Sequence, residues 1–135
     1  IMPDTGLVMH NLKDVKADYT ILVFWDPTCS HCKIEIPKLA QFYDSARTAG
    51  ISLEVFSIGI ESDIDLWKNY IKEHNLKWIN VSDLYNNTNF RNFYDIYSTP
   101  VIYLLDAEKR ILAKRLDTEK VKDFIEHSLK EKKTE

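Results

Sequence analysis

Two stretches of the chain are almost uniformly apolar, residues 20–25 (TILVFW) and residues 101–105 (VIYLL). Both are rich in β-branched and aromatic residues and lack polar alternation, which is typical of strands buried on both faces of a sheet. Residues 51–60 alternate between apolar and polar positions and predict a further strand. Residues 110–116 alternate too, and predict a half-exposed strand antiparallel to residues 101–105. Around Trp78 the pattern predicts a short strand or an extended link.

Three segments repeat their apolar residues at helical spacing. They run from Cys32 to about Thr48, from Ser62 onward, and from Asp117 or Thr118 onward. Their predicted inner faces are Ile36, Leu39, Tyr43 and Ala46 in the first, Leu66, Trp67, Tyr70 and Ile71 in the second, and Val121, Phe124, Ile125 and Leu129 in the third. Pro37 lies inside the first pattern, so it either kinks a helix that begins near Cys29 or starts a later helix.

The remaining segments are less informative. Residues 1–19 are weakly patterned, with one possible edge strand over residues 7–9, and residues 130–135 form a charged tail. A short helix is predicted over residues 90–97, ending before Pro100. Because strands and helices alternate without a linker or an internal repeat, we expect residues 1–135 to form a single α/β domain.

Composition narrows the class of protein. The chain has 135 residues, 44% of them hydrophobic, and a net charge of −3. Neither sign of charge dominates, so a nucleic-acid partner has no electrostatic support. The longest apolar runs are about five residues, whereas a membrane span needs about 20. Since the chain starts at Ile1, we expect an excised domain, with any signal peptide, anchor or further domain upstream.

Both cysteines of the chain, Cys29 and Cys32, lie between the first apolar strand and the first helix. Two cysteines are too few for a disulfide scaffold, and a bridge across so short a loop restrains the unfolded chain little. A zinc site requires about four ligands, and the chain has no second cysteine pair to supply them. Chance proximity remains the alternative, but this spacing after a strand favours a reactive pair.

The spacing predicts different roles for the two sulfurs. Residues three apart share one helix face. If the helix begins near Cys29, its positive end stabilises a thiolate there, while Cys32 is more enclosed. Cys29 would then attack a disulfide and Cys32 would resolve the mixed intermediate. Glu35 lies on the same face and could relay the proton of Cys32, although an exposed carboxylate that offsets the helix dipole is equally expected.

His31 lies between the two cysteines. As an imidazolium or a hydrogen-bond donor it would favour the thiolate form and make the disulfide more oxidising. The alternative is an ordinary solvated histidine at a helix start. The direction of electron flow therefore depends on this residue.

Several residues together carry a resemblance to a known family. They are Phe24-Trp25, Cys29-Ser30-His31-Cys32, Glu35 and Pro37, and Thr99-Pro100-Val101. On these residues the chain resembles the thioredoxin superfamily, and within it the TlpA/ResA-type thiol–disulfide oxidoreductases, from about Thr20 to Leu129. The resemblance implies a thioredoxin-like fold, with a central mixed β-sheet flanked by helices and a βα insertion over residues 60–78. It also implies an enzyme that needs no cofactor beyond the redox-active Cys29–Cys32 disulfide.

The resemblance assigns roles at the site. It implies that Pro100 is cis and lies against the cysteines, with the Thr99 backbone pairing with bound substrate, which the low cost of a cis X-Pro bond permits. A trans proline that only stops the preceding helix is the alternative. Trp25, Thr28 and His31 are expected to contact substrate as well, and Pro37 to kink the helix. Thioredoxins proper carry a buried aspartate where this chain has Val23, which favours Glu35 as the proton acceptor.

The resemblance further implies partners and a location. It predicts disulfide-containing substrate proteins, an upstream thiol donor, and a reductant's role outside the cytoplasm, periplasmic or membrane-anchored facing the periplasm. A histidine at position 31 is shared with more oxidising relatives such as DsbA. A peroxiredoxin-like peroxidase is an alternative, but such sites carry threonine where Asp26 stands. A redox-inert or metal-delivering module is another, although copper carriers of this fold space their cysteines one residue further apart and add a distal histidine.

Overall fold

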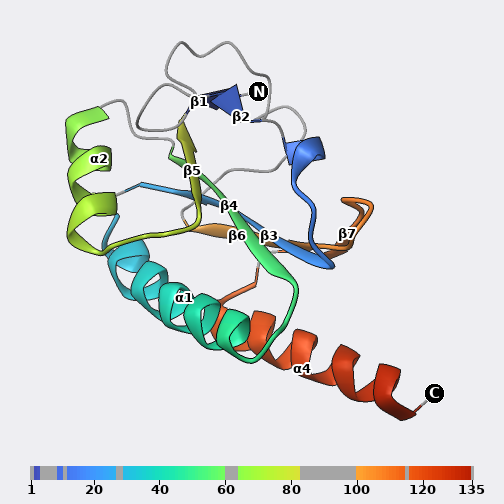
Figure 1. The fold of residues 1–135 in the computed structure, drawn as a ribbon. Coiled ribbons are helices and arrows are strands. Elements are labelled where there is room, and N and C mark those ends of the chain that lie inside the picture. Colours follow the sequence, from blue (N-terminus) through green and yellow to red (C-terminus); the bar gives the residue numbers. More distant parts are fainter. Residues whose placement is uncertain are drawn as a thin grey trace.

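The computed structural model of the chain describes residues 2–3, 9–10, 12–26, 29–59, 64–82, 100–114 and 116–134. Its centre is a five-stranded sheet in the order β5-β4-β3-β6-β7 (Figure 1). The strands are β3 (Tyr19–Trp25), β4 (Leu53–Gly59), β5 (Ile79–Ser82), β6 (Val101–Leu105) and β7 (Ile111–Ala113). The helices are α1 (Ser30–Thr48), α2 (Ile64–Glu73) and α4 (Thr118–Thr134). A separate antiparallel pair is formed by β1 (Met2–Pro3) and β2 (Met9–His10), followed by a 3-10 turn at Leu12–Asp14.

The sheet is mixed, as the resemblance implied. β3 runs parallel to β4 and antiparallel to β6, so that Ile21 faces Val55 on one side and Leu104 on the other. β5 is parallel to β4, and β7 is antiparallel to β6. Every residue of β3 and of β6 is buried, which confirms the prediction that both uninterrupted apolar runs form central strands.

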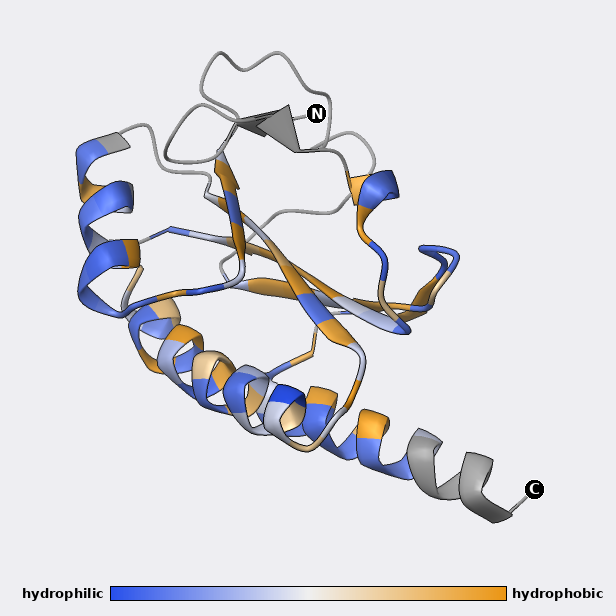
Figure 2. Cartoon of the chain, viewed as in Figure 1, coloured by the Kyte–Doolittle hydropathy of each residue, from blue (hydrophilic) through white to orange (hydrophobic). Residues whose placement is uncertain are grey.

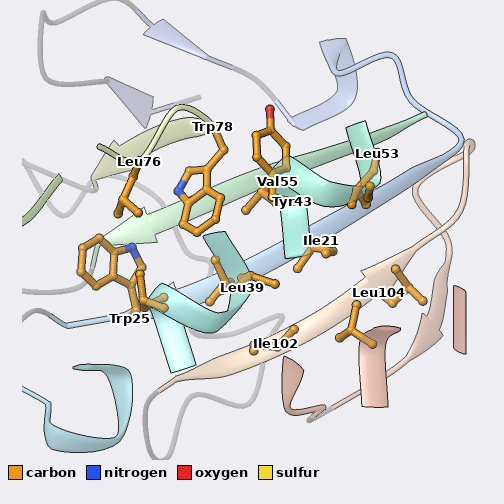
Figure 3. Close-up of a cluster of buried hydrophobic side chains, with 14 of the residues drawn as sticks. Ile21, Trp25, Leu39, Tyr43, Leu53, Val55, Leu76, Trp78, Ile102 and Leu104 are labelled. Carbon is orange, nitrogen blue, oxygen red and sulfur yellow. The ribbon is translucent and has the colours of Figure 1, made fainter. Parts of the chain in front are cut away.

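Each face of the sheet has its own apolar core. Alternate residues of β3 point to opposite faces, so Ile21, Val23 and Trp25 join one cluster while Leu22 and Phe24 join the other. The first cluster is closed by side chains of α1, α2 and α4. Figure 3 shows part of it, with Leu39 of α1 lying between Trp25 and Ile21 of β3. Hydrophobic residues are concentrated on the strands, whereas α1 and α4 alternate between hydrophobic and hydrophilic residues (Figure 2).

The helix predictions are confirmed in part, since Ile71 is only half-buried and the side chain of Leu129 is not among those described. All four predicted apolar residues of α1 are buried, and α1 begins at Ser30 with Pro37 inside it, so Pro37 does not start a later helix. In α4, Val121 and Ile125 are buried but Phe124 is 37% exposed, because the helix contacts the core along a narrower stripe than predicted. Leu66 of α2 is exposed for the same reason, while Trp67 and Tyr70 are buried.

The outer parts of the chain also bear on the predictions. α2 lies within residues 60–78, where the resemblance placed a βα insertion, whereas β5 begins at Ile79, directly after that segment. α4 continues to Thr134, so most of the charged tail is helical. The predicted helix at 90–97 falls outside the described residues, as do residues 7 and 8 of the predicted edge strand. Within the described part of the chain, no helix combines the length and the apolar character needed to cross a membrane.

Candidate active site

The chain turns from β3 into α1 at the first cysteine. Cys29 is the N-cap of α1, with extended backbone angles (φ −75°, ψ 124°), and its Sγ accepts the backbone N–H of Cys32 at 3.2 Å. Its own N–H donates to the Asp26 carbonyl at 3.0 Å, and its carbonyl accepts the N–H of Lys33 at 3.1 Å. The Cys29 sulfur therefore takes the place of a capping oxygen, where the positive helix end and a backbone N–H both stabilise a thiolate.

The two sulfurs differ in access. Cys29 is half-buried, whereas Cys32 is 1% exposed and belongs to the core cluster between the sheet and α1. Both are thiols in this structure. A bulky disulfide substrate can therefore reach Cys29 but not Cys32, which is the asymmetry that the spacing predicted.

Trp25 lies beneath this turn and does not face solvent. Its side chain is 0% exposed, its Nε1 donates to the Ser57 hydroxyl, and its ring packs on Tyr70 with centroids 5.1 Å apart. No part of the Trp25 side chain is accessible in this structure, so its predicted contact with substrate stays a prediction. As the last residue of β3 it points into the α1 side of the sheet, where it supports the segment that carries the cysteines.

Glu35 is buried rather than exposed, at 8% exposure. Its Oε2 accepts the Thr118 hydroxyl at 2.8 Å and the Thr118 backbone N–H at 3.1 Å. The alternative of an exposed carboxylate offsetting the dipole of α1 is therefore wrong. Instead the Glu35 carboxylate lies at the N-terminus of α4 and complements the positive end of that helix. Asp117 does the same, since its Oδ1 accepts the N–H of Lys120 at 2.9 Å.

The remaining predicted site residues are only partly described. His31 is exposed at the start of α1, and Pro100 is half-buried immediately before β6. Thr28 and Thr99 lie outside the described residues, and so does the conformation of the Thr99–Pro100 bond. Val23 is fully buried, so the position where thioredoxins carry an aspartate is apolar core here.

Tyr70 is a neighbour of the site that the sequence patterns did not identify as such. They placed it on the inner face of α2, but nothing connected it with Cys32. Its pKa is raised, first by burial and then by the charge of the Cys32 sulfur, and both side chains belong to the same core cluster. Only the packing of α2 against the end of β3 brings these residues together, and periodicity does not report such packing.

Within the described residues, no group of three or more His, Cys, Asp or Glu side chains is placed to hold a metal ion.

Comparison with known proteins places these features in a family. Residues 17–111 match a family model described as thioredoxin-like. Among solved structures, a domain of a possible thiol-disulfide isomerase from Cytophaga hutchinsonii is 41% identical, with a TM-score of 0.87 over 99% of this chain and 90% of that one. The thioredoxin domain of a thiol-disulfide oxidoreductase from Bacteroides vulgatus is 26% identical, with a TM-score of 0.79 over 91% and 90% of the two chains.

The chain is also similar to curated proteins. The thiol-disulfide oxidoreductase ResA of Bacillus subtilis is 26% identical over 112 residues, which are 83% of this chain and 60% of ResA. The chain thus spans less than two thirds of the length of that relative. The region that matches the family model covers most of the chain and includes both cysteines, and the five-stranded mixed sheet agrees with the fold expected of that family. The chain belongs to the thioredoxin-like family.

Proposed function

We propose that this chain is a thiol–disulfide oxidoreductase that reduces protein disulfides through Cys29 and Cys32. The observation that carries the proposal is the contrast between the two sulfurs. Cys29 caps α1, accepts the Cys32 N–H and is half-buried, whereas Cys32 is in the core. The similarity to proteins named as thiol-disulfide oxidoreductases supports the same activity.

The reaction proceeds by two exchanges. The Cys29 thiolate attacks one sulfur of a substrate disulfide, an S–S bond forms between Cys29 and the substrate, and the other substrate sulfur leaves as a thiolate. The Cys32 thiolate then attacks the Cys29 sulfur, which closes the Cys29–Cys32 disulfide and releases the second substrate thiolate. Two electrons pass to the substrate, and the two protons lost by the cysteines are taken up by the substrate thiolates. An upstream dithiol donor restores the pair, with no further cofactor.

Substrate recognition is assigned to the rim around Cys29. His31 is exposed two residues after Cys29, and Pro100 precedes β6, which pairs with the strand leading to Cys29. We propose that His31, Thr28, Thr99 and Pro100 contact the substrate, with the Thr99 backbone pairing with the substrate chain. Glu35 remains a candidate for relaying the proton of Cys32.

Single-cysteine variants test the activity. Cys29→Ser should abolish reduction of a disulfide protein such as insulin, whereas Cys32→Ser should accumulate a mixed disulfide between Cys29 and the substrate, seen as a mass adduct that a reductant removes. Ser45→Ala, at an exposed position of α1, is the control and should behave as the unaltered chain. Full turnover by Cys29→Ser would refute the proposal.

The direction of electron flow has its own test. A reductant should have a potential near the about −270 mV of thioredoxin, whereas a potential near the about −120 mV of DsbA would make the chain an oxidant. Equilibration with glutathione or dithiothreitol buffers, followed by alkylation of free thiols, measures it.

We also propose that the reaction takes place outside the cytoplasm, periplasmic or facing the periplasm, as the resemblance to the TlpA/ResA type implies. In intact cells a maleimide that cannot cross the inner membrane should then label Cys29 after mild reduction. Labelling that requires lysis would refute this location.

A further inference from the structure

A groove open to solvent lies at the end of the sheet opposite to the cysteines, where the end of α1 meets the start of β4 (Figure 1). It has a volume of about 310 Å³ and is lined by residues 16–17, 47 and 50–54. Tyr19 pairs with Leu53 at this end of β3 and β4, whereas Trp25, which leads to the cysteines, pairs with Gly59 at the other. At about 3.3 Å per residue, β3 places the groove about 20 Å from that turn. The groove is therefore separate from the site of disulfide exchange.

One nitrogen of the Arg47 guanidinium, which lines the groove, is fixed by neighbouring groups. Its Nη1 donates to the Tyr43 hydroxyl at 2.9 Å and to Oε2 of Glu54 at 3.1 Å. The Tyr43 hydroxyl in turn donates to Oε1 of Glu54 at 3.0 Å, and the Val55 N–H donates to the same oxygen at 3.1 Å. Tyr43 is buried, and the guanidinium carbon lies 5.3 Å from the centroid of its ring. These contacts hold the guanidinium in place although the Arg47 side chain is 52% exposed.

The other two nitrogens of the same guanidinium are unused. Every hydrogen bond of the Arg47 side chain to the described residues runs through Nη1, so Nε and Nη2 donate to none of them. Nε and Nη2 form one of the planar forks with which a guanidinium donates two parallel hydrogen bonds to a carboxylate or a phosphate. The bonds of Nη1 thus orient this fork without occupying it. An arginine held in this way loses less conformational freedom when it binds an anion.

The rest of the groove also offers more unused donors than acceptors. The Lys16 side chain is exposed and has no partner among the described residues. Ser52 Oγ accepts a backbone N–H at 3.1 Å, which leaves its hydroxyl hydrogen available. By contrast, the carbonyls of residues 45–47 at the end of α1 accept the N–H groups of residues 49–51. Glu54 is the only acidic residue that lines the groove, and both of its carboxylate oxygens are already bonded. The lining therefore has two cations to one anion and is suited to a negatively charged group.

We propose that this groove binds a carboxylate group, held by the free Nε–Nη2 fork of Arg47 and by the Lys16 ammonium. A singly charged, planar carboxylate matches the fork. A doubly charged phosphate fits less well, because the Glu54 carboxylate lies 3.1 Å from Nη1 of the same guanidinium and repels a second negative charge. The volume is at the lower end of the about 300–1,000 Å³ of ligand pockets. The carboxylate is therefore that of a small acid or of one acidic side chain of a partner peptide.

The test is an NMR titration of the reduced chain with N-acetylglycine, which carries one carboxylate and no amine. N-acetylglycinamide, its uncharged analogue, is the matched probe. N-acetylglycine should shift the Nε–H resonance of Arg47 saturably, and the amide should not. Arg47→Lys keeps the charge but removes the fork, and should weaken binding about tenfold. Lys16→Gln should weaken it about threefold, as expected for an exposed ion pair. Lys38→Gln, which removes an exposed lysine of α1 outside the groove, is the control and should leave the affinity unchanged.

The outcomes separate the groove from a general effect of charge. The proposal is overturned if N-acetylglycine causes no saturable shift, if the amide binds equally well, or if Lys38→Gln weakens binding as much as Lys16→Gln. Tighter binding of inorganic phosphate than of N-acetylglycine would overturn the assignment to a carboxylate. A peptide with blocked ends and a single internal glutamate identifies the source of the group. Tighter binding of this peptide than of N-acetylglycine supports an acidic side chain of a partner, and equal or weaker binding supports a small acid.

Discussion

The contact between Glu35 and Thr118 joins two helices through a buried carboxylate, and its strength can be measured. The Thr118 hydroxyl donates to Oε2 at 2.8 Å and its backbone N–H at 3.1 Å, 83 residues away in sequence. Thr118→Val removes the hydroxyl and keeps the shape of the side chain. A hydrogen bond to a charged group contributes about 1.5–3 kcal/mol, so we expect the free energy of unfolding to fall by about 2 kcal/mol.

The matched control keeps the hydroxyl. Thr118→Ser loses one methyl group, which should cost about 0.8 kcal/mol. Glu35→Gln keeps an acceptor oxygen but removes the charge at the N-terminus of α4, which should cost about 1 kcal/mol. In the Glu35→Gln background, Thr118→Val should cost only about 1 kcal/mol, because the bond it removes is then neutral.

Urea unfolding followed by tryptophan fluorescence is a suitable assay, since Trp25, Trp67 and Trp78 are all buried. If Thr118→Val and Thr118→Ser are equally stable, the reasoning about the carboxylate is refuted. The same variants separate anchoring from proton relay. If Glu35 also relays the Cys32 proton, Glu35→Gln should slow the release of the mixed disulfide, and Thr118→Val should not slow it to the same extent.

Three further changes test the packing and the electrostatics. Gly59→Ala should lower the unfolding free energy by about 1–3 kcal/mol, because the new Cβ would lie 2.5 Å from Nε1 of the buried Trp67; a neutral result in chemical unfolding would contradict this packing. Thr20→Val should raise it by about 1 kcal/mol, because the buried Thr20 hydroxyl has no partner among the described residues; a loss of stability in the same assay would indicate a partner. Burial and the charge of Glu54 raise the pKa of Tyr43 from 10.0 to about 12, so the neutral phenol is favoured in the folded chain. About 2.7 kcal/mol of stability should therefore be present below pH 10 and be lost as the pH rises to about 12, and Tyr43→Phe should remove this loss in pH-dependent unfolding.

Local sequence patterns predicted the central strands and the first helix well, because the burial of these elements depends on the residues within each of them. The uninterrupted apolar runs became β3 and β6, which are buried along their whole length. The four predicted apolar positions of α1 all face the core. The helix begins at Ser30, directly after Cys29, as the predicted roles of the two cysteines require. Burial on two faces and a period of 3.6 residues leave a direct mark on the sequence.

Contacts between elements that are far apart in the sequence could not be predicted from these patterns. The spacing of residues 35 and 118 does not predict that the Glu35 carboxylate of α1 accepts a hydrogen bond from the first turn of α4. The apolar run predicted the burial of Trp25, but nothing in the sequence showed that its ring packs on Tyr70 of α2. The exposure of Phe124 depends on how much of α4 the core can cover, which is a property of the whole packing arrangement.

The surroundings of the two sulfurs also differ in how far the local sequence predicts them. Cys29 is stabilised by its own helix end and by the N–H of Cys32, both of which the motif supplies wherever it occurs. Cys32 instead lies in a core that contains Trp25 of β3 and Tyr70 of α2. The motif therefore accounts for the capping position of Cys29, while the burial of Cys32 depends on residues outside the motif.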